Sequence, residues 1–252
     1  MARNRRFAFL GLAGLLGLAP CVHAGPITIA AIDIPGLLEP SQNGTYDRVL
    51  ARIAEMAGEK WQLNYLPAKR VNAVLTAEGS CAIPYDLHHF NEISAESKGA
   101  LIASLPINVA KVYLFTAPDS VPLGDIPDKS HFVVGVRRGL PYGQDVDRLL
   151  VSHPERFLVA NSEESNIRML LSGGINAMLA FLPDINHYYQ THPGTPALVF
   201  DKEKPIVVYK DSIVCGNTPE NSHLIDQINN GLTQMRSSGE LKKILGQNYI
   251  QP

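Results

Sequence analysis

The order of β-rich and helical segments is the feature that most constrains how this chain folds. Residues 26–33, 61–67 and 81–85 are β-rich, and amphipathic helical patterns over 45–59 and 68–80 lie between them. In such patterns apolar residues recur at the spacing of a helix turn. This order of strand, helix, strand, helix and strand predicts a parallel sheet with helices on its faces.

The pattern starts again in the second half of the chain. A strand-like run and a loop rich in proline and glycine lead into three more strands and two helices, over 131–136, 139–153, 156–161, 163–174 and 175–181. The rest of the chain then returns to strand and helix, over 204–217, 223–239 and 240–249. A returning terminal segment predicts two lobes joined by a pair of strands, a hinge that lets the lobes close on a ligand.

The first 24 residues have the organisation of a secretory signal peptide. MARNRR is basic, the next 14 residues are apolar, and Ala24 is a small residue at the expected cleavage point. A bilayer span needs roughly 20 apolar residues, which is more than this stretch offers. We therefore expect cleavage after Ala24 and export to the periplasm. An uncleaved anchor and lipidation at Cys21 are the alternatives.

Removing this leader makes the chain acidic. It takes Arg3, Arg5 and Arg6 from the 22 basic residues, which leaves 19 against 24 acidic ones and a formal charge of −5. A negative chain is a poor partner for nucleic acid or for an anionic membrane surface. We expect a monomer, free in the periplasm, that binds no nucleic acid and does not insert into the membrane.

Motifs for catalysis, cofactors or metals are absent from the sequence. The Gly-rich run 135–143 lacks the Lys-Ser/Thr ending of a phosphate loop, and no dinucleotide, HExxH or GxSxG motif occurs. His88 and His89 are adjacent on an expected loop, where two neighbouring side chains rarely converge on one metal ion. We expect neither a cofactor nor a metal.

Four segments spread over the chain carry a shared pattern. They are LPAKRVNAVLTAEGSCAI at 66–83, FVVGVRRGLPYG at 132–143, IRMLLSGGINAMLAF at 167–181 and SSGELKKILGQNY at 237–249. In this order they are similar to segments of the bacterial extracellular solute-binding proteins of family 3, the periplasmic amino-acid type that serves ABC importers. The resemblance covers essentially the whole chain after the leader.

The resemblance implies an α/β, two-lobed periplasmic-binding-protein fold of type II, with a two-strand hinge and the ligand between the lobes. Lobe one would comprise residues 25–110 and 201–252, and lobe two residues 111–200. Cys81 and Cys215, the two cysteines left after cleavage, would then both lie on strands of lobe one. An even count in an oxidising compartment favours a disulfide between them, with two buried free thiols as the alternative.

Two positions depart from the pattern of the amino-acid binders in this family. Those proteins use an arginine soon after the third strand of lobe one to bind the ligand carboxylate, whereas the matching stretch here offers Ser97 or Lys98. They also use an aspartate to bind the α-ammonium, at the position that is Phe181 here. A buried charge without its partner costs several kcal/mol. We therefore expect an apolar, aromatic pocket for a ligand other than a standard α-amino acid.

Candidate ligand contacts come from the ends of strands, where open α/β folds bind their ligands. In lobe one they follow the first and third strands or begin the second helix: Asp33, Glu39, Arg70, Tyr85 and Asp86. In lobe two, backbone N–H groups at 140–143 would open a helix and face an acceptor, and the candidate side chains are Arg138, Tyr142 and Phe181. A loop, surface or core role is the alternative for each of them.

The resemblance implies capture of a small organic solute for an inner-membrane ABC permease. The absence of the carboxylate-binding arginine and the ammonium-binding aspartate also fits a second role. The chain would then be a periplasmic accessory or sensor protein on the same fold, partnered with a quinoprotein dehydrogenase or a sensor kinase. A dehydratase-like enzyme would need a cleft acid with a raised pKa, with Glu39 or Asp86 as the candidates. We expect a binding protein and not an enzyme.

Overall fold

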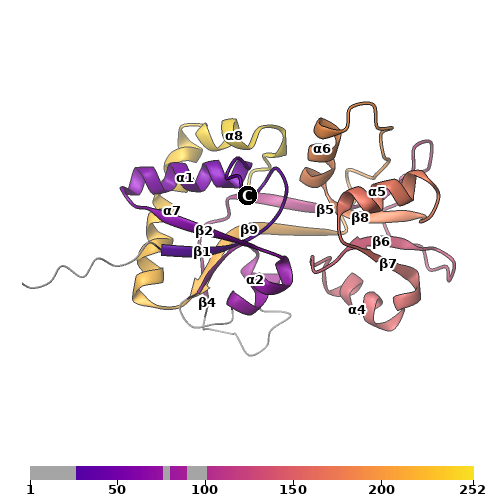
Figure 1. The fold of residues 1–252 in the computed structure, drawn as a ribbon, viewed down its shortest axis with the longest axis horizontal. Helices are drawn as coiled ribbons and strands as arrows, with labels where there is room; N and C mark the ends of the chain where they lie inside the picture. The colour runs from indigo at the N-terminus through magenta and orange to yellow at the C-terminus, as the bar shows by residue number, and fades with distance from the viewer. Residues whose placement is uncertain (1–26, 76–79, 90–100) are drawn as a thin grey trace, which may run out of the picture.

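The structure is a computed structural model that describes residues 27–75, 80–89 and 101–252. The expected signal peptide, residues 1–24, lies outside the described residues, as do Ser97 and Lys98. Figure 1 shows two lobes. The elements in chain order are β1 (Ile27–Ile32), α1 (Thr45–Ala57), β2 (Trp61–Leu66), α2 (Ala68–Leu75), β3 (Cys81–Tyr85), β4 (Leu101–Ala103), β5 (Asn108–Thr116), β6 (Val134–Arg137), α4 (Gln144–Ser152), η2 (Pro154–Arg156), β7 (Phe157–Ala160), α5 (Glu163–Leu171), β8 (Ala177–Phe181), α6 (Leu182–Thr191), β9 (Val207–Gly216), α7 (Pro219–Ser237), α8 (Glu240–Leu245) and η3 (Gly246–Asn248).

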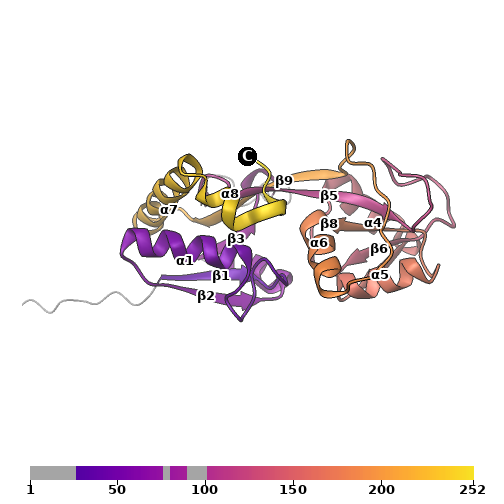
Figure 2. The ribbon, with the colours of Figure 1, turned by 90° about the horizontal axis from the view of Figure 1, so that it is seen from above.

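Two long strands join the lobes. β5 and β9 pair antiparallel, with Asn108 opposite Asp211 and Val112 opposite Val207. Beyond this shared stretch, β9 pairs with β3 and β4 in lobe one, and β5 pairs with β8 in lobe two. The strand order is β2-β1-β3-β9-β5-β8-β6-β7. Figure 2 shows β5 and β9 side by side between the lobes, which is the two-strand connection that the element order predicted.

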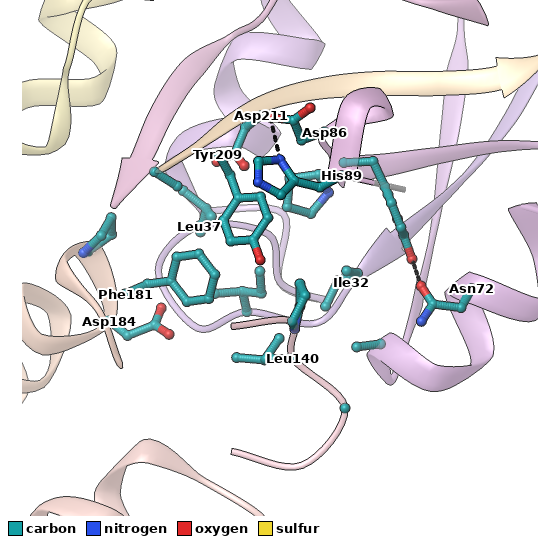
Figure 3. A pocket seen from close by; sticks show the side chains of 18 of the residues that line it. Ile32, Leu37, Asn72, Asp86, His89, Leu140, Phe181, Asp184, Tyr209 and Asp211 are labelled. Carbon is teal, nitrogen blue, oxygen red and sulfur yellow. Dashed lines mark hydrogen bonds and ion pairs between the residues drawn. The ribbon is translucent and has the colours of Figure 1, made fainter. Parts of the chain in front are cut away.

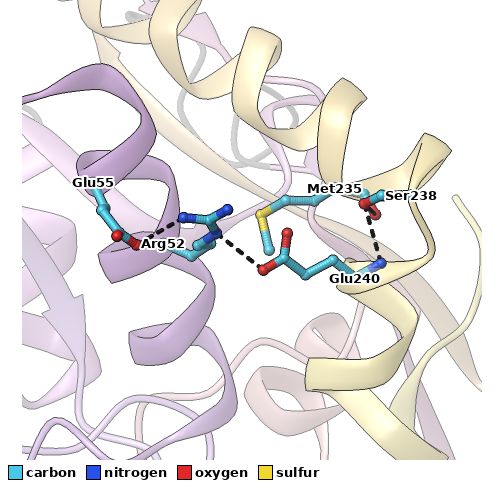
Figure 4. Close-up of polar contacts among 5 residues, drawn as sticks. All are labelled: Arg52, Glu55, Met235, Ser238 and Glu240. Atoms are coloured by element: carbon cyan, nitrogen blue, oxygen red, sulfur yellow. Dashed lines mark hydrogen bonds and ion pairs between the residues drawn. The ribbon is translucent and has the colours of Figure 1, made fainter.

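Lobe one is built from both ends of the described chain. β1 lies between β2 and β3 and is parallel to both. On one side α1 packs against α7, where a Cβ added at Gly231 would meet the Ile53 side chain at 2.7 Å. At the surface of the neighbouring α1–α8 contact, Arg52 donates hydrogen bonds to Glu55 at 2.8 Å and to Glu240 at 3.0 Å (Figure 4). Such exposed ion pairs contribute little to stability, so the apolar core holds this lobe together.

A disulfide fastens the returning segment to lobe one. Cys81 of β3 and Cys215 of β9 lie opposite each other in the antiparallel pair and are joined by an S–S bond. Both are buried among apolar side chains of the same core. The bond closes a loop with a sequence separation of 134 residues.

Lobe two is a sheet with an apolar core on each face. β6 pairs parallel with β7 and β8. Val146 of α4 belongs to the core on one face, and Ile167 of α5 and Ile185 of α6 belong to the core on the other. β8 is buried from both sides, which explains why AMLAF reads as a continuous apolar run.

Three details differ from the sequence predictions or decide between them. α6 was not anticipated; it has Pro183 in its first turn, a position that tolerates proline because its N–H would be unpaired there. β6 begins at Val134 rather than at 131, since the N–H of Val133 is bonded to the side chain of Asn176 and not to a strand. For the run at 204–217 the sequence allowed two strands or one bent strand, and the structure has one long strand, β9 (Val207–Gly216), that serves both lobes.

Candidate functional site

A cavity of about 400 Å³ lies between the lobes, beside the paired strands β5 and β9. Its wall comes from lobe one, from lobe two and from the two joining strands (Figure 3). The lining residues are Ile32, Ile34, Leu37, Ala68, Asn72, Pro84, Tyr85, Asp86, His89, Ala110, Gly139, Leu140, Pro141, Asp147, Phe181, Pro183, Asp184, Tyr209 and Asp211. A space of this size and composition fits a small organic molecule.

Aromatic rings form one side of this cavity. Phe181, at the end of β8, faces Tyr209 of β9 with the ring centroids 5.9 Å apart. The ring of Tyr209 also lies 4.6 Å from that of His89. Figure 3 shows these three rings next to one another. They come from three distant segments of the chain, so only the tertiary structure brings these rings together.

Asp211 places a buried carboxyl on the strand that joins the lobes. It lies two residues after Tyr209 on β9, so the two side chains lie on the same face. Asp211 is 7% exposed and accepts a hydrogen bond from the Tyr46 hydroxyl at 2.6 Å. Burial raises the pKa of Asp211 to about 7; the Tyr46 hydrogen bond opposes this, and the charges of Asp86 and Asp184 add to it.

Asp184 is a second buried carboxyl, in the first turn of α6. Its side chain is 9% exposed, and its Oδ2 lies 3.9 Å from Nη1 of Arg137 on β6. Burial raises the pKa of Asp184, although the nearby Arg137 charge lowers it. Glu163 of α5 shares this environment: burial and then the Asp184 charge raise the pKa of Glu163. Two acids therefore compete for one arginine in lobe two.

Asp86, directly after β3, is held by several donors. Its Oδ2 accepts the N–H of Lys210 on β9 at 2.8 Å, and its Oδ1 accepts the N–H of His88 at 2.9 Å. Nδ1 of His89 lies 3.3 Å from the same Oδ2. These contacts connect the segment after β3 to the joining strand β9.

Three of the eight candidate residues line the cavity: Tyr85, Asp86 and Phe181. The Tyr85 hydroxyl donates a hydrogen bond to the side chain of Asn72, which also lines it. Phe181 ends β8 as the sequence indicated, and its ring lines the cavity.

The other candidates of lobe one lie outside the cavity lining. Glu39 accepts the N–H of Gly36 at 3.0 Å and the Ser41 hydroxyl at 2.7 Å, so it closes the turn that contains it. Asp33 and Arg70 are exposed. A local loop bond explains Glu39, and α2 directs Arg70 to its outer face.

In lobe two, Arg138 and Tyr142 also lie outside the cavity lining. Arg138 is exposed, and its Nε donates a hydrogen bond to Asn161 at 3.1 Å. Tyr142 is buried in a core of lobe two, where its hydroxyl accepts the N–H of Arg137 at 2.7 Å. The N–H of Tyr142 is itself bonded to Asp147 at 3.4 Å, so this helix start is capped from within the chain.

Sequence reasoning missed Tyr209, Asp211 and Asp184. The sequence does mark Asp211, because it is the one acid in the β-rich run VVYKDSIVCG, most of which is buried in the structure. Asp184 carries none, because an acid in the first turn of a helix is favoured by the helix dipole wherever the helix lies.

The lobes also touch outside the joining strands. Nη2 of Arg137 in lobe two donates to the backbone oxygen of Asp33 in lobe one at 3.2 Å. The side chain of Asn186 on α6 donates to that of Asn248 at 2.8 Å. Gly36 lies against the ring of His187, with no room for a Cβ. These contacts hold the lobes together around the cavity.

The described residues contain neither a metal site nor a membrane span. No group of three or more His, Cys, Asp or Glu side chains among them is arranged to hold a metal ion. In the same part of the chain, every helix is too short or too polar to cross a membrane.

No protein-family model and no curated protein matches the sequence, but many solved structures share the fold. The GluR0 ligand-binding core from Nostoc punctiforme, solved with L-glutamate, is 17% identical; the match has a TM-score of 0.66 and covers 89% of this chain and 99% of that one. ArtJ, the arginine-, lysine-, histidine-binding protein of Geobacillus stearothermophilus, is 16% identical, with a TM-score of 0.66 and coverage of 90% and 97%. A histidine kinase sensor domain with similarity to periplasmic binding proteins is 15% identical, with a TM-score of 0.65 and coverage of 88% and 95%.

At this level of identity the likeness shows the fold. The chain has the two-lobed α/β fold of the periplasmic binding proteins, which the resemblance of the four sequence segments implied. Its cavity lies between the two lobes.

Proposed function

We propose that this chain is a solute-binding protein that holds a small organic molecule between its two lobes and closes on it. The cavity of about 400 Å³, lined from both lobes and from β5 and β9, carries this proposal. A ligand in that space would touch both lobes at once and would therefore favour their closed arrangement over an open one. We assign the chain to the amino-acid type of family 3, acting in the periplasm after loss of residues 1–24.

The ligand we propose is not a standard α-amino acid. Phe181 fills the position from which the related amino-acid binders bind the ammonium, and Asp184, three residues later, supplies an acid to the same cavity. No arginine or lysine occurs among the described residues that line the cavity, so the wall they form offers no guanidinium or ammonium group to a carboxylate. The absence of that partner argues against a zwitterion.

Identification of a co-purifying compound tests the proposal most directly. Native mass spectrometry of the purified protein should detect a small molecule that is lost on denaturation. A thermal-shift screen over amino acids, polyamines, organic acids and aromatic compounds should find a class that raises the Tm. Leu140→Trp fills part of the cavity from lobe two and should abolish the shift. Failure of both measurements to detect a ligand would refute solute binding.

The partner that receives the loaded protein is proposed to be an inner-membrane ABC permease. A sensor or accessory role is the second candidate, and the likeness to a histidine kinase sensor domain favours it. Permease and ATPase genes beside this gene would support import, and capture of the permease by the ligand-loaded protein would demonstrate it. A neighbouring sensor kinase or dehydrogenase, captured in the same way, would support the second candidate instead.

We propose that the cavity binds its ligand without catalysing a reaction. A buried acid with a raised pKa, as Asp211 is, meets one requirement of a general acid. Burial and neighbouring negative charge account for that pKa without any reaction. Compounds that bind should be recovered unchanged after prolonged incubation, and a product that accumulates in proportion to protein concentration would refute this.

A further inference from the structure

We infer that the ligand of this cavity is an organic ammonium compound, with N–H donors on a protonated amine and an apolar or aromatic body. The inference rests on the proposed function, since it names the ligand class of the same cavity. The charge of the cavity wall and its unused hydrogen-bond acceptors favour this ligand class.

Carboxylates from four separate segments line the cavity. Asp86 follows β3, Asp147 lies on α4, Asp184 lies in the first turn of α6 and Asp211 lies on β9. Figure 3 labels Asp86, Asp184 and Asp211. Arg137 is not part of the described lining; it lies beside Asp184 and donates to the backbone oxygen of Asp33 in the other lobe. Among the described residues, this wall holds carboxylates but no arginine or lysine, and a low-dielectric wall of this charge attracts a positive group and repels a carboxylate or a phosphate.

Asp184 shows an unused hydrogen-bonding capacity directed at this space. Its side chain is more than nine-tenths buried, and no described residue donates a hydrogen bond to it. Its nearest cation, Nη1 of Arg137, lies 3.9 Å away, beyond hydrogen-bond distance. Figure 3 shows the carboxylate directed into the space below the ring of Phe181. Asp184 lines the cavity, so a ligand N–H placed there would find a free acceptor.

Of the other three acids in the wall, two are occupied and one is half available. Asp147 accepts the backbone N–H of Tyr142 at 3.4 Å. Asp86 already accepts two backbone N–H groups and lies beside His89. Asp211 uses Oδ2 to accept the Tyr46 hydroxyl, and no described residue donates to its Oδ1. The amine is therefore expected between Asp184 of lobe two and Asp211 of the joining strand, where it would hold the lobes together.

The rest of the wall determines the body of the ligand. Phe181 and Tyr209 present adjacent rings, and Leu37 and Leu140 face the same space. Rings of this kind contact an aromatic or aliphatic body and also attract a cation placed over their faces. A fully polar polyol or a highly charged anion would leave this surface without matching contacts.

Binding of an ammonium should be linked to proton release. Tyr46 of α1, Asp86 after β3 and Asp184 of α6 face Asp211, whereas Arg137 of β6 and Glu163 of α5 face Asp184. The pKa of Asp211 is about 7 without ligand, and an adjacent ammonium would lower it. Amine affinity should therefore increase from pH 6 to pH 8, by up to about tenfold per pH unit below pH 7.

Matched compounds test the inference by calorimetry on the purified full-length protein, freed of co-purified ligand. The probes are 2-phenylethylamine, 2-phenylethanol, 3-phenylpropionate and L-phenylalanine, and hexylamine against 1-hexanol repeats the comparison with an aliphatic body. We expect the better amine to bind at least about tenfold more tightly than its alcohol. Asp184→Asn should weaken amine binding by about 10- to 100-fold, as expected for a charge-assisted bond. Asp145→Asn, which changes an exposed acid of α4, is the matched control and should bind as the wild type does.

The outcomes separate this inference from the proposed function. Equal binding of amine and alcohol, or tighter binding of the carboxylate or the zwitterion, would overturn the ammonium inference and leave solute binding intact. Unchanged amine binding in Asp184→Asn would also overturn it. Binding by none of the probes overturns it as well, and the native mass spectrum then decides independently whether the protein holds another solute.

Discussion

Replacing Asp211 by asparagine should stabilise the ligand-free protein at neutral and alkaline pH. Burial raises the pKa of this carboxyl from an ordinary 3.8 to about 7. Between these values the folded protein keeps a proton that the unfolded chain releases, so the free energy of unfolding falls as the pH rises. At about 1.4 kcal/mol per pH unit over about three units, the loss is on the order of 4 kcal/mol and is complete above pH 7.

Asparagine keeps the shape of the carboxyl and removes its charge. Its side-chain oxygen can still accept the Tyr46 hydroxyl, which lies 2.6 Å from the carboxylate in the wild type. The variant should therefore match the wild type near pH 4 and exceed its free energy of unfolding by about 2–4 kcal/mol at pH 8. The gain appears only without ligand, because a bound cation would compensate the charge.

Urea denaturation at pH 5, 6, 7 and 8 measures this difference, with the fluorescence of Trp61, the one tryptophan of the chain, as the signal. The other acids are present in both proteins, so the difference between the two curves reports Asp211 together with its electrostatic coupling to Asp86 and Asp184. Asp145→Asn controls for the loss of one surface acid. Equal pH slopes in the wild type and in Asp211→Asn would refute the assignment of a buried, protonated carboxyl at the joining strand.

Three further predictions concern the ligand, the disulfide and lobe closure. Phe181→Ala should weaken ligand binding by about tenfold or more, measured by calorimetry, because it removes an aromatic wall; the free energy of unfolding should fall by only about 1 kcal/mol, since the ring is half-buried. Cys81→Ala with Cys215→Ala should lower the free energy of unfolding by ~3–5 kcal/mol, because the bond closes a loop of 134 residues. Gly36→Ala should open the lobes in solution scattering and weaken binding, because its Cβ would overlap His187.

Each of these has a distinct contrary result. Loss of folding in Phe181→Ala would make the ring a core residue and not a ligand contact. Two titratable thiols from Cys81 and Cys215, in denatured and unreduced protein, would exclude the disulfide. An unchanged scattering profile and affinity in Gly36→Ala would mean that the Gly36–His187 contact does not govern closure.

The architecture could be read from the sequence because its signals are local. Apolar spacing over 45–59 and the buried run AMLAF depend only on the neighbours of each residue, and both formed the elements that they indicated. Glycine at 58 ends α1 for an equally local reason, since its φ of +69° is costly for other residues. α6 escaped prediction because its apolar face is short and its first turn contains a proline.

The residues of the candidate site were predicted less accurately than the fold, because they are not neighbours in the sequence. Tyr85, Asp86 and Phe181 lie at the ends of strands and line the cavity. Arg70, chosen at the start of the second helix, and Arg138, chosen after a strand, are exposed. The position of a residue at a strand end predicts which edge of the sheet it lies near. It does not predict whether its side chain points toward the ligand or toward solvent. Glu39 shows the difference, because its hydrogen bonds to Gly36 and Ser41 use the carboxylate within its own turn.

The sequence by itself determined the order of strands and helices, the two lobes and the return of the chain that joins them, because periodicity and turn residues act over a few positions. Only the tertiary structure decided that Asp184 and Asp211 share one cavity with Phe181 and Tyr209. β9 pairs with the distant strand β5, and Asp211 on β9 contacts Tyr46, which lies 165 positions earlier in the chain. Burial where these segments meet, and not residue type, raises the pKa of the Asp211 carboxyl in the cavity wall.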